Sequence, residues 1–421
     1  MNQLYNTNNI LESLFESFEY ADTAQLRLVL DLDHSDEVLR QYLSIDEMRE
    51  IGSFFTGQKL SSLAVKGLCN AITFDSVVLD PTCGAGNLLI ECSRKLGIKN
   101  SLLETLKLWG NVLCGFDLFE SFIRATKMRL ILEALDRGAK KDCSLAEALS
   151  QFGNIKVMDA MYLHSEELKN ITHAIMNPPF SSWDSPEVNY WKKGKVNSAG
   201  VVLDHYIRNL PDECVISAIL PDVLRSGSRY EEWRSYTSNN LIGNCEVIGR
   251  FNKKTDVDVF LLTGLLKTSN ENISWFKSLQ EYTPVSEFFD VCIGPLVAYR
   301  DPEKGPRYPY VHPKNAPVWE TLKELSETRE FTGRIIEPPF VVIRRTSSPS
   351  DKSRASATII ATAEAVAVEN HLIVIRPKSS TIKDCKKLLK VLKSPKTNDF
   401  LNDRMRCRHL TVGIVKQIPF Q

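Results

Sequence analysis

Short apolar runs of strand length alternate with longer amphipathic stretches through the first two thirds of the chain. Runs at residues 76–79, 112–116, 155–158 and 173–176 are short enough for buried strands, and Phe119–Leu135 has helical spacing between two of them. Strands that alternate with helices are typical of a parallel sheet covered by helices on both faces. We therefore predict a doubly wound, Rossmann-like α/β domain.

Further elements flank this core. Residues 1–50 carry apolar positions spaced for helices. The same periodicity predicts further helices at Leu60–Ile72, Val201–Leu210 and Tyr230–Ser238, and a further strand at Cys214–Leu220. A hairpin-like pair around Glu246–Phe251 and Val257–Leu266 is predicted to close the sheet with an antiparallel strand. These elements extend the predicted sheet beyond its four parallel strands.

The texture of the sequence changes near residue 285. A proline-rich stretch is followed by a predicted helix near Trp319–Thr328, strands near Ala357–Ile375 and a basic helix at Ile382–Ser394. This mixture predicts a separate α+β domain. The expected organisation is a helical segment at residues 1–50, an α/β domain at 51–284 and a further domain at 285–421.

Charge and cysteine content narrow the possible functions. Residues 1–290 hold 29 basic and 39 acidic side chains, whereas residues 291–421 hold 23 and 13. A basic terminal third on an acidic body suggests binding to a polyanion, although a lysine-rich solvated surface is an alternative. The 10 cysteines form no CxxC pair or Cys/His cluster, so neither a metal site nor a disulfide framework is expected. Without a signal peptide or a membrane-spanning run, a cytoplasmic location is expected.

Three predicted strands each end in an acid, and the first of them enters a glycine turn. The string Asp80-Pro81-Thr82-Cys83-Gly84-Ala85-Gly86 allows a ligand to approach the backbone closely. Asp80 would repel a pyrophosphate and suits a cationic amino group, such as that of S-adenosylmethionine. Asp117 is placed for ribose hydroxyls and Asp159 for an adenine amino group. Ordinary glycine turns and helix-capping acids are the alternatives.

Two further motifs carry polar groups suited to a ligand. In Asn177-Pro178-Pro179-Phe180, the amide oxygen and a proline carbonyl can accept both N–H bonds of a planar amino group, and the phenyl ring can stack on it. In Phe54-Phe55-Thr56-Gly57, a hydroxyl and free N–H groups at a helix start suit a small carboxylate. A stiff Pro-Pro loop and a plain helix cap are the alternatives.

Over roughly residues 45–266 these motifs resemble those of N6-adenine DNA methyltransferases in which the cofactor motifs precede the catalytic motif. Phe54–Gly57 resembles the family's Phe-Tyr-Thr-Pro and departs at its final Pro, Asp80–Gly86 resembles Asp-Pro-Ala-Cys-Gly-Ser-Gly, and Asn177–Phe180 resembles (Asp/Asn)-Pro-Pro-(Tyr/Phe/Trp). The resemblance implies catalysis by Asn177, Pro178, Pro179 and Phe180, with the target base packed on Phe180 and Phe251. It implies S-adenosylmethionine bound by Phe55, Thr56, Asp80, Cys83, Gly84, Gly86, Asp117, Leu118, Asp159, Ala160 and Asn177.

The resemblance also implies a reaction and its partners. A class I methyltransferase would methylate N6 of an adenine flipped out of double-stranded DNA at a specific site, releasing S-adenosylhomocysteine and using no metal. It would act in a prokaryotic cytoplasm, with a cognate restriction endonuclease encoded separately and no membrane partner. Residues 285–421 resemble, more weakly, the target-recognition domains of restriction-modification specificity proteins. Predicted DNA contacts are Lys192, Lys193, Lys195, Arg344 and Arg345. The three lysines lie in an otherwise unpatterned loop at residues 181–200, whose aromatic side chains suit stacking on bases, although a flexible surface loop is the alternative; these side chains are Trp183, Tyr190 and Trp191.

Three rival functions share part of this evidence. Protein glutamine and RNA base methyltransferases use the same Asn-Pro-Pro chemistry, but the glutamine enzymes are shorter, usually carry Tyr in the fourth position and lack a basic extension. The third is a DNA-binding specificity subunit with a vestigial cofactor fold. That reading predicts decayed motifs, whereas all four acidic or amide positions are present: Asp80, Asp117, Asp159 and Asn177.

Overall fold

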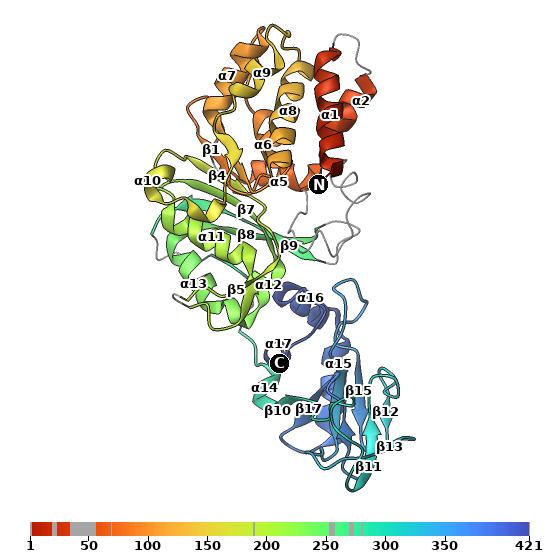
Figure 1. The fold of residues 1–421 in the computed structure, drawn as a ribbon. Coiled ribbons are helices and arrows are strands. Elements are labelled where there is room, and N and C mark those ends of the chain that lie inside the picture. Colours follow the sequence, from red (N-terminus) through yellow and green to blue (C-terminus); the bar gives the residue numbers. More distant parts are fainter. Residues whose placement is uncertain are drawn as a thin grey trace. The chain divides into compact units, whose positions relative to one another are not determined.

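The chain folds into two compact units. The computed structural model describes residues 2–18, 23–33, 56–68, 70–187, 190–251, 257–268, 273–278 and 281–420. The units comprise Met1–Trp275 and Phe276–Gln421 (Figure 1). The division lies between Trp275 and Phe276, earlier than the boundary predicted at residue 284, and the N-terminal helices belong to the first unit.

The first unit is built on a seven-stranded sheet in the order β3-β2-β1-β4-β7-β9-β8. Its strands are β1 (Val78–Asp80), β2 (Leu113–Asp117), β3 (Ile155–Val157), β4 (His173–Met176), β7 (Val215–Pro221), β8 (Leu241–Arg250) and β9 (Asp258–Leu266). The first five strands in this order, from β3 to β7, are parallel to one another. Strand β9 pairs antiparallel with both of its neighbours, β7 and β8. The strand order reverses between β1 and β4, and open sheets of this kind bind ligands at the carboxyl ends beside that reversal. The predicted doubly wound sheet with an antiparallel closing pair is confirmed.

Helices cover both faces of this sheet. They are α5 (Gln58–Lys66), α6 (Asn87–Ser93), α7 (Leu102–Val112), α8 (Glu120–Asp136), α9 (Leu145–Ser150), η2 (Ala160–Tyr162), α10 (Ser165–Leu168), α11 (Ser198–Asn209), α12 (Asp222–Ser226), η3 (Ser228–Tyr230) and α13 (Glu231–Asn240). Consecutive strand residues point to opposite faces. Val78 therefore joins a core with α5 to α9, while its neighbour Leu79 joins a second core with α10, α11 and α13.

Two N-terminal helices, α1 (Asn2–Glu16) and α2 (Thr23–Leu30), pack against α8. Phe15 is fully buried, and the ammonium group of Lys141 lies 4.2 Å from its ring centroid. An ion pair of 2.6 Å joins Glu12 to Arg124 on α8. The N-terminal helices are thus part of the core of the first unit, because they cover a face of α8 that would otherwise be exposed.

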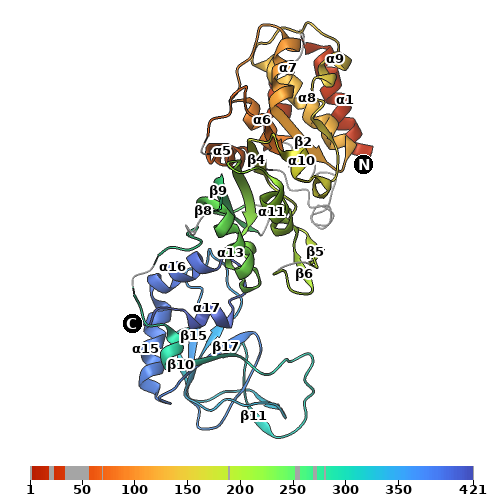
Figure 2. The ribbon, with the colours of Figure 1, turned by 90° about the vertical axis from the view of Figure 1, so that its left-hand side faces the viewer.

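Residues 181–200 contain a hairpin where the sequence predicts an unpatterned loop with aromatic side chains available for stacking. Strands β5 (Ser182–Asp184) and β6 (Lys195–Asn197) pair antiparallel and project beside α11 (Figure 2). Trp191 is only 2% exposed, and the Tyr190 hydroxyl donates to Asp204 on α11. These two aromatic residues anchor the hairpin to the core, because removing their apolar surface from water is favourable.

The second unit combines a five-stranded sheet, β10-β17-β14-β15-β12, with a three-stranded sheet, β13-β11-β16. Its elements are α14 (Val285–Phe288), β10 (Phe289–Ile293), β11 (Arg307–Val311), β12 (Thr321–Leu322), β13 (Thr328–Glu330), β14 (Phe340–Arg344), β15 (Ala357–Ile360), β16 (Ala367–Val368), β17 (Leu372–Pro377), α15 (Ile382–Lys393), α16 (Pro395–Arg404) and α17 (Val412–Lys416). One face of the larger sheet packs against α15, α16 and α17, and the other closes a separate small core. The predicted α+β class is confirmed.

The helix predicted near Trp319–Thr328 is wrong. In its place, β12 pairs parallel with β15, and β13 pairs antiparallel with β11. Leu322 packs against the small core of the larger sheet. Tertiary pairing with β15 therefore outweighs the local helical spacing. Across both units, none of the helices in the described ranges has the length and apolarity needed to cross a membrane.

Candidate functional site

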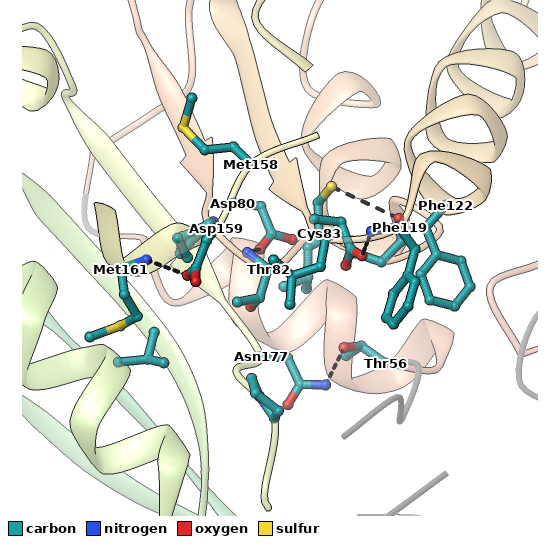
Figure 3. Close-up of a pocket in the computed structure, with 18 of the residues that line it drawn as sticks. Thr56, Asp80, Thr82, Cys83, Phe119, Phe122, Met158, Asp159, Met161 and Asn177 are labelled. Carbon is teal, nitrogen blue, oxygen red and sulfur yellow. Dashed lines mark hydrogen bonds between the residues drawn. The ribbon is translucent and has the colours of Figure 1, made fainter. Parts of the chain in front are cut away.

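The carboxyl edge of the large sheet brings the strand-end side chains to one pocket. Asp80 ends β1, Asp117 ends β2, Asp159 follows β3 and Asn177 follows β4. All four line the pocket drawn in Figure 3, and Thr56 lines it as well. The sequence predicts this convergence, because carboxyl ends of parallel strands share one edge.

Most other residues predicted to bind a cofactor lie in the same pocket, and several apolar residues join them. Gly86 lies outside the lining, and Phe55 lies outside the described residues. Predicted residues that line the pocket, besides those named above, are Cys83, Gly84, Leu118 and Ala160. Lining residues that the sequence did not assign to the cofactor include Phe119, Phe122, Met158, Met161, Trp183 and Val202. The two phenylalanines lie within five residues of Asp117 in the sequence. Residues that directly follow a strand-end acid could therefore have been predicted to line the pocket.

Two carboxylates hold the glycine turn after β1. The Thr82 N–H donates to Asp80 Oδ1 (3.1 Å), and the Gly84 N–H donates to Asp117 Oδ2 (3.1 Å). Gly84 and Gly86 have φ values of +53° and +84°, in the region that favours glycine. The turn therefore presents backbone to the pocket in a shape that other residues adopt with difficulty.

Asp80 is buried in a way that favours a cationic ligand. Its side chain is 1% exposed, and this burial raises the pKa of its carboxyl to about 8, with the nearby Asp117 raising it further and the Thr82 N–H opposing the shift. Burial also raises the pKa of Asp117. A buried carboxylate is costly unless an opposite charge accompanies it. An ammonium group bound in the pocket would restore the ionised form of Asp80.

Gly86 offers a direct test of the turn. A Cβ built on Gly86 would lie 2.6 Å from Cγ2 of Thr126, in addition to the strain of a positive φ. We expect Gly86→Ala to lower the free energy of unfolding by about 1–3 kcal/mol and to weaken cofactor binding. Gly153→Ala is the matched control, because a Cβ there meets no atom within 4 Å. Equal denaturation midpoints for both variants would contradict this account of the turn.

The loop after β4 is held by the start of α11. Ser198 Oγ donates to the Pro179 carbonyl (2.5 Å), and Asn197 Nδ2 donates to the Phe180 carbonyl (3.2 Å). Within the described residues, no hydrogen bond to the Pro178 carbonyl accompanies these contacts. The loop is thus fixed by its later carbonyls, and the Pro178 carbonyl keeps its capacity to accept a hydrogen bond.

The Asn177 side chain lies next to that of Thr56 in the pocket (Figure 3). Its Nδ2 donates to the Thr56 hydroxyl oxygen over 3.0 Å. This contact gives the amide a definite orientation, because its oxygen then lies on the side away from Thr56. Asn177 is therefore positioned by a residue of the first predicted motif, 121 positions earlier in the chain.

The two aromatic residues predicted to pack on a target base touch each other. The ring centroids of Phe180 and Phe251 are 5.8 Å apart with an interplanar angle of 79°. Phe251 is 6% exposed and belongs to the core, whereas Phe180 is half-buried. This edge-to-face arrangement presents at most one of the two ring faces to a planar ligand in a given orientation.

The lysines predicted to contact DNA lie on the β5–β6 hairpin and its turn. Lys192, Lys193 and Lys195 are exposed. Lys195 pairs with Asp184 (2.9 Å), and Lys192 lies 3.8 Å from Glu232. Exposed ion pairs of this kind contribute little stability, so these lysines remain open to exchange their partners for phosphates.

The arginines predicted to contact DNA lie at the end of β14 in the second unit. Arg344 is exposed, and its guanidinium donates to the Pro313 carbonyl over 3.2 Å. Arg345 is half-buried, and its backbone bonds to His371 and Leu410. The side chain of Arg344 is therefore the more accessible of the two.

The profile of a family described as N-6 DNA Methylase matches residues 32–238, which include every strand-end residue of the pocket. This stretch is similar to the N-6 DNA methylase family. N-6 DNA methylases are S-adenosylmethionine-dependent methyltransferases that act on DNA. Comparison with curated proteins finds no match.

Several solved structures share the fold at low identity. The type IIL restriction-modification enzyme MmeI, solved in complex with DNA, is 13% identical, with coverage of 97% of this chain and 70% of that one and a TM-score of 0.49. The type IIG restriction endonuclease BpuSI is 13% identical (92% and 61%, TM-score 0.44). A type I restriction-modification methyltransferase subunit from Streptococcus thermophilus is 18% identical (60% and 55%, TM-score 0.36). The matched region thus spans 61% of BpuSI and 55% of the Streptococcus subunit.

The residues of the pocket fit the cofactor of the N-6 DNA methylases. Burial raises the pKa of Asp80, and a cationic amino group bound beside it would stabilise its carboxylate form. The turn at Gly84 leaves its backbone accessible to the ligand. Asp117 and Asp159 add acceptors farther along the same pocket. The donor set therefore suits an amino acid joined to a nucleoside.

Proposed function

We propose that this protein transfers a methyl group from S-adenosylmethionine to N6 of an adenine flipped out of duplex DNA. The observation that supports this proposal best is the position of Asn177 in the lining of an acid-lined pocket, with Pro178 directly after it in the chain. An amide oxygen and a free carbonyl side by side match the two N–H bonds of an exocyclic amino group. We also propose that it serves a restriction-modification system in a prokaryotic cytoplasm.

In the proposed complex, the acids of the pocket hold the cofactor. Asp80 would pair with its amino group, Asp117 would accept from its ribose hydroxyls, and Asp159 would accept from its adenine amino group. The turn at Gly84 would let the ligand approach the backbone. S-adenosylmethionine, when bound, supplies an electrophilic methyl group on a sulfonium sulfur.

The chain's own contribution to the chemistry is positional. Asn177 Oδ1 and the Pro178 carbonyl would accept both amino protons of adenine, which draws the nitrogen lone pair out of conjugation with the ring. That lone pair then points toward the methyl group, as in other reactions accelerated by orientation and fixed dipoles. Phe180 would stack on the base, which must leave the duplex to reach this edge.

The DNA would be held by basic side chains of the hairpin and of the second unit. We expect Lys192→Ala together with Lys193→Ala to weaken DNA binding, because each phosphate contact releases counterions. The slope of log affinity against log salt should fall in magnitude by about 1.8, the value for two lost contacts. The measurement is fluorescence anisotropy at several salt concentrations.

The exposed Lys107 on α7 provides a matched control for this pair of substitutions. Lys107→Ala removes one positive charge far along the sequence from the hairpin, and it should leave the salt slope unchanged. An unchanged slope in the double variant would remove the hairpin from the DNA-binding surface.

Rival substrates are a protein glutamine amide or an RNA base, which the same Asn-Pro-Pro-Phe loop could hold. The excess of basic residues beyond residue 290 favours a nucleic acid, and the match to N-6 DNA methylases favours DNA. A protein that binds DNA with a vestigial cofactor site would bind no S-adenosylhomocysteine. Calorimetric titration with S-adenosylhomocysteine therefore separates the enzyme from that alternative.

The deciding experiment is expression in a host free of adenine methylation, followed by sequencing that detects modified bases. We expect N6-methyladenine at one recurrent sequence motif. Folded, cofactor-binding protein without any methylated adenine would overturn the DNA assignment. Protection of that motif against a nuclease encoded alongside the protein would test the restriction-modification role.

A further inference from the structure

Thr56 contacts the proposed catalytic amide from within the pocket. Its side chain is 4% exposed, and its hydroxyl oxygen accepts the hydrogen bond from Asn177 Nδ2 at 3.0 Å. A hydroxyl has one hydrogen to donate and two lone pairs to accept with. If the hydroxyl hydrogen is donated to another group, the Thr56 oxygen can only accept a hydrogen bond from Asn177.

The backbone of Thr56 is held by buried hydrogen bonds. Its carbonyl accepts from Asn87 Nδ2 (2.8 Å) and from Ser61 Oγ (3.1 Å). Asn87 is 3% exposed, and the same nitrogen also donates to the Leu32 carbonyl (2.9 Å). Thr56 is thus fixed between α6 and the chain that follows α2, so its hydroxyl has little freedom of position.

Arg129 fixes the orientation of Asn87. Its Nη1 donates to Asn87 Oδ1 (2.6 Å) and to the Ala85 carbonyl (2.7 Å), and its Nε donates to the Val29 carbonyl (2.9 Å). A guanidinium group can only donate, so Asn87 must turn its oxygen toward Arg129 and its nitrogen toward Thr56. A continuous set of buried hydrogen bonds consequently runs from α8 through Asn87 to the Thr56 backbone.

The chemistry of a hydroxyl links this network to the ligand. A carboxylate only accepts, so a carboxylate bound beside Thr56 would take the hydroxyl hydrogen. The Thr56 oxygen could then only accept from Asn177, which keeps the Asn177 nitrogen toward Thr56. The amide oxygen would be held on the opposite side, as the capture of an adenine amino group requires.

We propose that Thr56 is a positioning residue that couples the carboxylate of the bound cofactor to the orientation of the Asn177 amide. Asn87 and Arg129 support it by fixing its backbone. This inference rests on the proposed function, because it concerns the same cofactor and the same amide. It assigns the hydroxyl of Thr56 two partners, the cofactor carboxylate and the Asn177 nitrogen.

The test compares Thr56→Val, which keeps the shape and removes the hydroxyl, with Thr56→Ser, which keeps the hydroxyl. Calorimetry should show weaker binding of S-adenosylhomocysteine to the valine variant by about tenfold or more, as for a lost hydrogen bond to a charged group. Binding of 5′-methylthioadenosine, which has no carboxylate, should not change. The serine variant should restore the affinity of the wild-type protein.

Turnover on DNA carrying the methylated motif provides the second readout. At saturating cofactor and DNA, Thr56→Val should lower kcat by about tenfold, which corresponds to one lost orienting hydrogen bond. In an Asn177→Ala background the same substitution should leave the residual kcat unchanged, because the amide it orients is gone. Thr237→Val, which removes a buried hydroxyl bonded to Trp233 on α13, should alter neither readout.

Three outcomes would overturn the inference. One is an unchanged kcat in Thr56→Val, and another is an equal loss of kcat with and without Asn177. The third is equal weakening of both ligands in calorimetry, which would make Thr56 a general part of the pocket wall. A wild-type protein that methylates no adenine would instead sink the proposed function, and the inference with it, so the two failures are distinguishable.

Discussion

Asn177→Ala should lower kcat for adenine methylation by about 10²- to 10³-fold, the loss seen when one fixed hydrogen-bonding group is removed from a reacting centre. The reason is that the alanine variant leaves one of the two amino protons of adenine without its acceptor. Affinity for S-adenosylhomocysteine should change far less, because the acids of the pocket remain. The measurement is transfer of radiolabelled methyl groups to DNA at saturating cofactor.

Asn177→Asp is the matched variant for this prediction. It keeps an acceptor oxygen at the same place, and the resembling family uses either residue there, so it should retain more activity than Asn177→Ala. Thermal unfolding midpoints of the two variants should agree within a few degrees. Wild-type turnover by Asn177→Ala would show that the amide takes no part in the reaction.

Asp80→Asn should weaken binding of S-adenosylhomocysteine by about 10- to 100-fold, which corresponds to one hydrogen bond to a charged group. In the wild-type protein, burial raises the pKa of Asp80 to about 8, so the carboxyl of the empty pocket is mostly protonated near neutral pH. Binding of an ammonium group requires the carboxylate. Wild-type affinity should therefore rise between about pH 6 and 8, whereas the asparagine variant should show no such rise.

Asp80→Asn should weaken ligand binding but raise the free energy of unfolding of the ligand-free protein at pH 8. The folded protein keeps a proton on Asp80 that the unfolded chain releases above its ordinary pKa of 3.8, so this residue makes the wild-type protein less stable as pH rises from about 4 to 8. Asp80→Asn removes that dependence while keeping an acceptor for the Thr82 N–H. Without ligand, the variant should be the more stable protein at pH 8, as measured by urea unfolding. A lower stability at pH 8 would contradict the assigned burial of charge.

The positions of the strand-end residues follow from sequence for a physical reason. A parallel strand that ends in an acid and leads into a helix places that acid at the carboxyl edge, wherever the rest of the chain goes. Asp80, Asp117, Asp159 and Asn177 therefore meet in one pocket. The chemical roles assigned to them remain predictions, which the variants described above test.

Other features depend on packing that local sequence does not encode. Arg129 lies in a helix where charged residues usually face solvent, yet it is 3% exposed and bonds to the turn after β1. Tyr190 and Trp191 stand beside lysines and suggested a surface for stacking, yet they anchor a hairpin. The periodic stretch after Trp319 fails as a helix because β15 offers it a partner far along the chain. Each case depends on a long-range contact.

The hydrogen bond between Arg129 and Val29 has a consequence for how the first unit can be shortened or exchanged between proteins. Recognisable similarity to the family starts at residue 32, but the buried guanidinium of Arg129 depends on a carbonyl three residues before that start. A fragment trimmed to the region of similarity would lose that acceptor together with α1 and α2. The region of family similarity is therefore shorter than the segment that this buried contact requires. An exchange of this unit between proteins that keeps the pocket intact should include the first thirty residues.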